Sequence, residues 1–110
     1  MIHSSYELRY LPLFYEELNH AVSYIAFNLC NPEAADNLID IIESAILTRL
    51  EQGPESFEQV PSRQERAHPY YRIYIKNYVI YYVVLEENGR KIMEVRRLLH
   101  LLENREKKLK

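Results

Sequence analysis

The sequence predicts an α+β fold in the order β-α-α-β-β-β, with a helical hairpin packed on a small antiparallel sheet. Two observations carry this prediction. Between about residues 13 and 50, apolar residues recur at spacings of three and four, which is typical of amphipathic helices. From residue 70 the period changes to two, which is typical of strands. Two successive helices followed by a run of strands predict an α+β domain.

A short strand and a helix are expected first. Residues Tyr6–Leu11 alternate apolar and charged side chains, which predicts a strand. Pro12 ends that strand and suits the first position of a helix. The helix carries one apolar stripe, and Glu16, Glu17 and Asn19 are expected to lie off it. The stripe consists of Phe14, Leu18, Ala21, Val22, Ile25, Ala26 and Leu29.

A second helix is expected almost immediately after the first. Asn31 can cap it, Pro32 suits its first turn, and Glu33 favours the positive end of its dipole. Its apolar stripe continues to Leu50, and Gly53-Pro54 ends it. The connection at Cys30-Asn31 is so short that the two helices are predicted to form an antiparallel hairpin.

Three strands are expected to form a meander after a loop over residues 53–69. They are Tyr70–Ile75, Tyr78–Leu85 and Lys91–Leu99, with turns at Lys76-Asn77 and at residues 87–89. The middle strand is apolar on both faces, so it is expected to be central. Because two helices cover only one face, we expect the other face to show tyrosines, aliphatic side chains and basic residues that a partner covers.

One domain, residues 1–103, is expected within the 110 residues, followed by a charged tail, 104–110, that is either a frayed helix or disordered. The content of 47% hydrophobic and 27% charged residues is that of a folded, soluble protein. No apolar run approaches the roughly 20 residues of a membrane helix, and residues 1–6 show no secretory signal. The single cysteine, Cys30, excludes an internal disulfide. These features favour the cytoplasm and no membrane contact.

The net charge of −2 conceals an asymmetry along the chain. Residues 1–62 carry two basic and ten acidic residues, a net charge of −8, whereas residues 63–110 carry twelve basic and six acidic residues, a net charge of +6. A basic half can bind a polyanion or an acidic protein. The alternative, given equal weight, is a solvated face balanced by the acidic helices.

Four sequence segments together resemble the RelE/ParE superfamily of toxins, also called plasmid-stabilisation proteins. Tyr6–Leu11 leads into a helix containing Leu18 and Tyr24-Ile25. Asn31-Pro32-Glu33-Ala34-Ala35 opens a helix that ends at Leu50 and Gly53-Pro54. Tyr71-Arg72-Ile73 precedes Asn77-Tyr78-Val79-Ile80-Tyr81-Tyr82, and Val95-Arg96-Arg97-Leu98-Leu99-His100 closes the pattern. Each segment is degenerate alone, and the four in this order cover residues 6–103.

The resemblance implies a bacterial toxin that inhibits growth and an antitoxin, encoded alongside, whose C-terminal segment wraps the toxin. Two activities exist in the superfamily. RelE-like members cut mRNA in the ribosomal A site without a metal, and ParE-like members trap DNA gyrase. No cofactor is implied. A homodimer is compatible with the resemblance.

His100, Arg72 and Arg96 are the candidate catalytic residues if the chain is RelE-like. Ribose 2′-OH activation needs an acid or base, which His100 can supply, and the phosphate needs a cation. Each has a plain structural alternative. His100 can be a strand-end surface residue, and Arg72 can form an ion pair or stack on the tyrosines. Arg96 and Arg97 are expected on opposite faces of their strand, one with the basic face and the other on the helices.

Lys76, Arg97 and Tyr78 are the candidate target-binding residues. Ribonuclease members often place a second basic residue where this chain has Asn77-Tyr78, and a net charge of −2 is low for a ribosome binder. Both departures favour a ParE-like toxin that acts by binding. A RelE-like endoribonuclease and an inactive, binding-only homologue stay open as alternatives. The spacing of the four histidines and Cys30 predicts no metal site.

Overall fold

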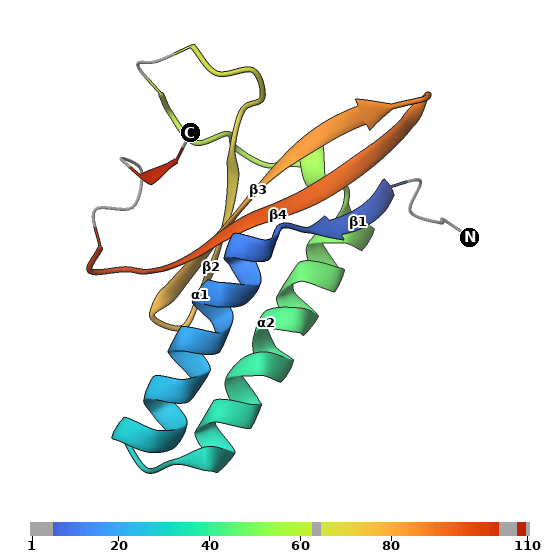
Figure 1. Cartoon of the computed structure of the whole chain (residues 1–110). Coiled ribbons are helices and arrows are strands. Elements are labelled where there is room, and N and C mark those ends of the chain that lie inside the picture. The colour runs from blue at the N-terminus through green and yellow to red at the C-terminus, as the bar shows by residue number, and fades with distance from the viewer. Residues whose placement is uncertain (1–5, 63–64, 104–107, 110) are drawn as a thin grey trace.

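Two helices pack on one face of a four-stranded sheet (Figure 1). The computed structural model describes residues 6–62, 65–103 and 108–109. Its elements are β1 (Tyr6–Tyr10), α1 (Pro12–Ser23), a π-helical turn (Tyr24–Asn28), α2 (Pro32–Gln52), a 3₁₀ turn (Pro54–Ser56), β2 (Tyr71–Ile75), β3 (Tyr78–Glu87) and β4 (Arg90–His100). The predicted order β-α-α-β-β-β and the α+β class are confirmed. The tail prediction for 104–110 falls outside the described residues except for Lys108 and Leu109.

The strand order in the sheet is β1-β4-β3-β2, and the sheet is mixed. The last three strands form the predicted antiparallel meander. The first strand pairs with the last in parallel, Tyr10 opposite Val95, so the expectation of a wholly antiparallel sheet is wrong at this edge. The helical hairpin lies between β1 and β2 in the chain, and it returns the chain to the opposite edge of the sheet (Figure 1).

The helix-facing core joins the stripes of both helices to the sheet. Phe14, Leu38, Ile42 and Ile46 are buried against strand residues that include Tyr82. The side chain of Asn31 accepts a hydrogen bond from the Ala34 backbone N at 3.1 Å, which confirms the predicted cap of α2. At the other end, Gly53 has a φ of +94°, a conformation that favours glycine and that ends the helix.

The end of α1 is irregular. The backbone N of Leu29 donates to the Tyr24 carbonyl and that of Asn31 donates to the Ile25 carbonyl, which widens the last turn into a π-helix. Cys30 then adopts a φ of +51°, which lies in the left-handed region that non-glycine residues seldom enter. Together these features reverse the chain between the two helices.

The sheet face away from the helices is covered by the chain itself. Val79, Tyr81 and Val83 of β3 have no exposed side-chain surface. They pack with Val60 and Tyr70 of the long loop, with Leu99, and with Leu109 near the C-terminus. The expectation that a partner covers these residues is therefore wrong, because Val60, Tyr70 and Leu109 form a second small core with them.

A β-bulge interrupts the pairing of β3 with β4. Tyr81 lies opposite Arg97, but the next residue, Tyr82, lies opposite Val95, so Arg96 is the extra residue. Arg97 therefore shares the face of Tyr81, away from the helices, and Arg96 contacts Tyr70 on that same face. The prediction that strand alternation sends Arg96 and Arg97 to opposite faces is wrong for this reason. The expectation that one of the two contacts the helices is confirmed, because the Arg97 guanidinium binds Glu17 of α1.

The hydroxyl of Tyr82 joins the sheet to the end of α2. It is fully buried, donates to the Pro54 carbonyl at 2.7 Å, and accepts from Arg49 Nη1 at 2.9 Å. Burial raises the pKa of this phenol. The hydroxyl therefore gives the Pro54 carbonyl a donor and gives Arg49 Nη1 an acceptor in addition to the Arg72 carbonyl at 3.2 Å.

Tyr82→Phe is expected to lower the free energy of unfolding by about 1–3 kcal/mol, because it leaves the Pro54 carbonyl and Arg49 short of a hydrogen-bond partner. Tyr74→Phe is the matched control. Its side chain is 55% exposed, so the same change is expected to alter stability by less than about 0.5 kcal/mol. Urea unfolding of the two variants measures this, and equal midpoints would contradict the assigned role.

Candidate functional site

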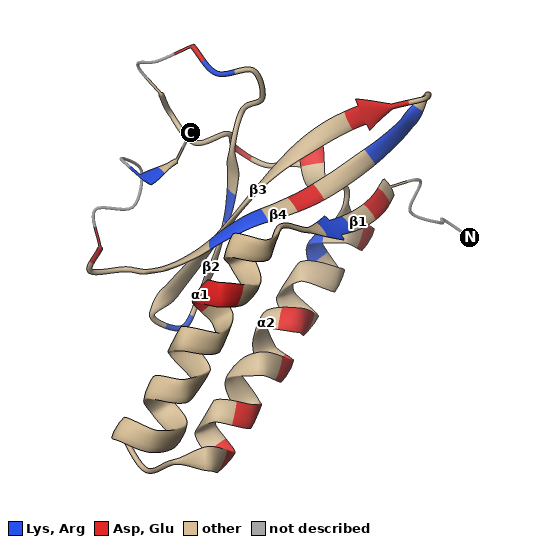
Figure 2. Ribbon diagram, viewed as in Figure 1, with Lys and Arg blue, Asp and Glu red and all other residues tan. Residues whose placement is uncertain are grey.

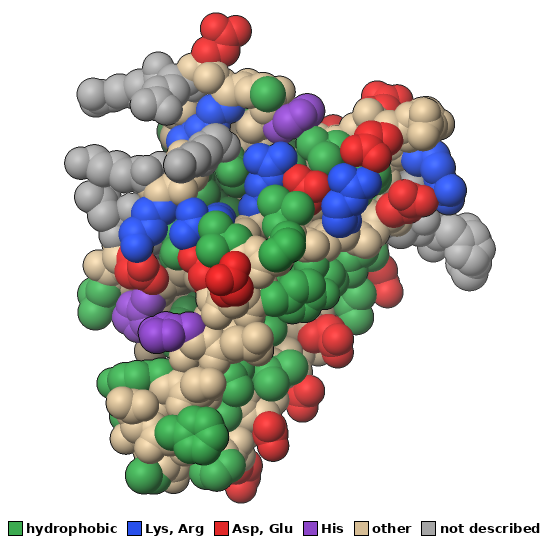
Figure 3. Space-filling view, in the orientation of Figure 1, with side chains coloured by type: hydrophobic (Ala, Val, Ile, Leu, Met, Phe, Trp, Pro, Cys, Tyr) green, Lys and Arg blue, Asp and Glu red, His purple; other side chains and the backbone are tan. Residues whose placement is uncertain are grey.

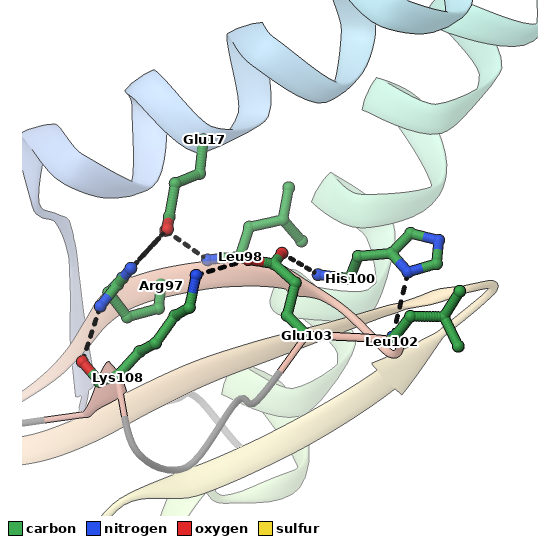
Figure 4. Close-up of polar contacts among 7 residues, drawn as sticks. All are labelled: Glu17, Arg97, Leu98, His100, Leu102, Glu103 and Lys108. Atoms are coloured by element: carbon green, nitrogen blue, oxygen red, sulfur yellow. Dashed lines mark hydrogen bonds and ion pairs between the residues drawn. The ribbon is translucent and has the colours of Figure 1, made fainter.

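His100 ends β4 and faces the helices. It lies opposite Tyr78, and the two rings meet edge-on with centroids 5.4 Å apart. The ring Nδ1 accepts a hydrogen bond from the Leu102 backbone N at 3.1 Å, which leaves Nε2 as the protonated nitrogen of a neutral ring. The His100 backbone N donates to the Glu103 carboxylate at 2.8 Å. Figure 4 shows the contacts of His100 with Leu102 and Glu103 where the chain leaves the sheet.

Arg72 and Arg96 lie on the other face of the sheet from His100. Arg72 pairs in register with Tyr81, whose side chain lies in the core away from the helices, and the Arg72 guanidinium lies 5.6 Å from the Tyr74 ring. Arg96 Nε donates to Glu94 at 2.8 Å and Nη1 to the Tyr70 hydroxyl at 3.3 Å. The sheet therefore separates the candidate acid–base residue from both candidate phosphate-binding arginines.

Arg97 bridges the sheet to α1. Its Nε and Nη2 donate to both oxygens of Glu17, the shortest contact being 2.7 Å, and its Nη1 donates to the Lys108 carbonyl at 2.8 Å. This hydrogen-bonded carboxylate raises the pKa of the guanidinium. Figure 4 shows the guanidinium held between α1 and the C-terminal segment. Its hydrogen-bonding groups are used within the chain.

Glu17 has a second role at the same edge. Strand β1 stops at Tyr10, opposite Val95, so the part of β4 beyond Val95 has no neighbouring strand on that side. The Glu17 carboxylate accepts a hydrogen bond from the Leu98 backbone N at 2.9 Å. One carboxylate thus satisfies an open sheet edge and holds a guanidinium.

Sequence analysis missed Glu17, which was expected off the apolar stripe. The spacing of Glu17 from the buried Phe14 and Ala21 is three and four residues, so it lies on the sheet-facing side of α1. An acidic residue at a stripe position is the signal that could have found it, since a carboxylate there needs a basic partner.

Lys76, Tyr78 and His100 do come together. All three line a cavity of about 570 Å³ between the end of the helical hairpin and the β2–β3 turn. A neighbouring cavity of about 430 Å³ is lined by Glu16, His20 and Glu103 among others. Because both cavities share Tyr24, Tyr78 and His100, they adjoin, and we call them together the hairpin-end cleft. Of the three candidate target-binding residues, only Arg97 lies outside it.

Many of the described basic residues of the basic half are paired with carboxylates in the fold. Within 65–103 and 108–109, five form ion pairs, and they are Arg90, Lys91, Arg96, Arg97 and Lys108. Arg9, from the acidic half, forms ion pairs as well. Buried Glu94 alone binds both Arg9 and Arg96. By contrast, Figure 2 shows acidic positions recurring along α2, which carries Arg49 as its single basic residue. In the fold, the charge asymmetry of the sequence thus appears as an acidic helix α2 and a sheet whose basic residues are mostly paired with carboxylates.

Two classes of site find no support among the residues that the structure describes. Over those ranges, no three histidine, cysteine, aspartate or glutamate side chains gather to hold a metal ion. Over the same ranges, no helix is long and apolar enough to cross a membrane. Cys30 is exposed at the turn between the helices.

The fold and this surface define a small α+β protein with a partly aromatic cleft at the end of a helical hairpin. The chain belongs to the family described as ParE toxin of type II toxin-antitoxin system, parDE, whose family model matches residues 8–104. It is therefore the toxin of a type II toxin–antitoxin pair, and the family implies an antitoxin partner. No curated protein matches the chain.

Glu17→Ala is expected to lower the free energy of unfolding by about 2 kcal/mol, because it leaves Arg97 and the Leu98 N–H without their carboxylate. This expected loss of unfolding free energy is smaller than for a fully buried ion pair, since both side chains are 17% exposed. Glu16→Ala, at the exposed neighbouring position, is expected to cost less than about 0.5 kcal/mol. Denaturant unfolding compares them, and equal losses would argue against the bridge.

Glu103 is expected to titrate below the usual range of a glutamate. Lys108 donates to it at 2.8 Å and lowers its pKa, so the contact contributes fully above the pKa of a free glutamate and is lost as the pH falls through the lowered value. Lys108→Ala should raise this pKa and Lys108→Arg should largely preserve it. Carboxyl ¹³C shifts followed against pH measure it; an unchanged titration in Lys108→Ala would disprove the contact.

Proposed function

We propose that this toxin arrests growth by binding a protein target, with DNA gyrase as the precedent in its superfamily, and does not cut RNA. The observation that carries the proposal is the position of His100 on the opposite face of the sheet from Arg72 and Arg96. An acid or base and a phosphate-binding cation must reach one scissile phosphate within hydrogen-bonding distance. A sheet between them prevents these three residues from acting on one phosphate.

The charge distribution supports the same proposal. Binding to RNA in a ribosome depends on basic side chains that replace counterions along phosphates. Arg96 and Arg97 are instead engaged with Glu94 and Glu17. The acidic row along α2 would repel a polyanion. A protein surface is the partner class that these features favour.

One observation supports the ribonuclease alternative. Lys76 and His100 line the same cavity, so a cation and an acid–base group do share one side of the sheet. A RelE-like site there would use these two residues with Tyr78 in place of Arg72 and Arg96. The alternative of an inactive, binding-only homologue predicts no growth arrest at all.

Induction of the toxin without its antitoxin is expected to stop growth, to raise a DNA-damage response and to leave mRNA 5′ ends unchanged. Purified toxin is expected to inhibit supercoiling by purified gyrase, since binding alone carries the proposed activity. Arg72→Ala, which lies outside the hairpin-end cleft, should keep full toxicity. RNA-end sequencing and a supercoiling assay on the same preparations provide the measurements.

New mRNA cleavage sites that disappear in His100→Ala would establish the ribonuclease alternative. Growth arrest with uncut mRNA and intact supercoiling would exclude gyrase as the target. That result would still agree with action by binding to another protein. Normal growth while the folded toxin accumulates would support the inactive homologue.

A further inference from the structure

The helical hairpin extends beyond the sheet that covers its upper part (Figure 1). The sheet stops at the β2–β3 turn, Lys76-Asn77, and at His100. The π-helical turn Tyr24–Asn28 and Leu29, which follow α1, lie at this end of the hairpin, and three of their apolar side chains remain in contact with solvent. Tyr24, Phe27 and Leu29 are 50%, 77% and 57% exposed. Figure 3 shows hydrophobic side chains gathered over this end of the molecule.

These exposed side chains continue into the hairpin-end cleft. The larger of its two cavities has an apolar lining from both helices, including Ile25, Leu29, Leu38 and Ile41. Tyr24 and Tyr78 stand where its two cavities meet. A concave, apolar surface with a few polar groups at its edges is typical of a binding site.

The local backbone holds one wall of this cleft in an uncommon conformation. The π-helical turn at Tyr24–Asn28 presents Tyr24 and Leu29, both of which line the cleft. Such turns are rare and frequently occur at functional sites. Cys30, with its positive φ, follows directly.

The charges around the cleft indicate the chemistry of its partner. Asp40 lines the larger cavity and Glu16 the smaller, and neither forms an ion pair within the described ranges. Two further carboxylates of the cleft, Glu17 and Glu103, are neutralised by basic residues of the chain. Among the residues that the structure describes, Lys76 is the single Lys or Arg side chain that lines either cavity. The acidic row of α2 leads up to Asp40 and adds to this negative surface.

We propose that the hairpin-end cleft binds a segment of the target protein in which an aliphatic side chain lies next to a lysine or arginine. The aliphatic side chain enters between Tyr24, Leu29 and Ile41, and the basic side chain pairs with Asp40 or Glu16. This inference rests on the proposed action by protein binding. Beyond that proposal, it identifies the surface that binds the target and the chemistry of the segment that binds there.

Selection on the immobilised toxin from a random peptide library displayed on phage tests the cleft without a known target. The expected consensus places an aliphatic residue beside a lysine or arginine. Leu29→Ser should weaken the selected peptide about 30-fold, as the loss of a buried anchor does. Leu102→Ser is the matched control, because Leu102 is 90% exposed and lies outside the cleft, and it should leave affinity unchanged.

A second pair of variants tests the charge. Asp40→Lys should weaken the same peptide roughly fivefold or more, because it replaces attraction with repulsion. Glu43→Lys, one turn along the exposed side of α2 and outside the cleft, should have little effect. Unfolding midpoints of the four variants show that each remains folded.

Several outcomes would overturn the inference. They are an acidic consensus, binding that Leu29→Ser leaves intact, equal effects of Asp40→Lys and Glu43→Lys, or a dimer in light scattering that Leu29→Ser converts to a monomer. The supercoiling assay separates this inference from the proposed function. If the wild type inhibits gyrase and Leu29→Ser inhibits it equally, the cleft proposal fails and the gyrase proposal stands. If the wild type leaves gyrase untouched, gyrase is excluded, and the peptide selection still tests the cleft.

Discussion

The burial of β3 on both faces is the constraint on which the rest of the structure depends. A strand with apolar side chains on both sides must be covered twice. The helical hairpin covers one side, where Ile80 and Tyr82 lie. The long loop and Leu109 cover the other, where Tyr81 lies. Leu109 therefore belongs to a core, and among the described residues the sheet has little open face left to offer a partner.

The coverage of both sheet faces determines where the basic side chains of β4 can go. Its arginines reach the edges of the covered faces, where nearby carboxylates bind them. Glu17 and Glu94 each bind more than one group, so they fix Arg97 and Arg96 in place. Ion pairs of this kind connect elements of the fold, and they leave the guanidinium groups less available to a phosphate. The end of the hairpin combines exposed apolar side chains with an acidic side chain, Asp40, that forms no ion pair within the described ranges.

The fold could be predicted from the sequence because its signals are local. Helical periodicity, the cap at Asn31 and the change of period at residue 70 each report on neighbouring residues, and all were confirmed. The parallel pairing of β1 with β4 could not be found in this way, because pairing between distant strands leaves little trace in either segment. Coverage by Leu109 has the same cause, since one leucine in a charged tail gives no periodic signal.

The site was harder to predict than the fold. One bulged residue places Arg96 and Arg97 on the same face, and strict alternation excludes such an arrangement. The separation of His100 from Arg72 depends on the register of three strands. Lys76, Tyr78 and His100 share a cavity because two strand ends and a helical turn meet there. The sequence predicted Lys76 and Tyr78 as target-binding residues and His100 as a catalytic residue, and it did not predict that the three lie together.

Hydrogen–deuterium exchange of the toxin with and without purified gyrase tests the central claim most directly, because it locates binding without assuming an activity. The account predicts slower exchange on complex formation in residues 24–41 and 76–78, with the buried strand β3 unchanged. Protection confined to β1 and the far ends of β3 and β4, with the hairpin end exchanging as in the free toxin, would contradict it.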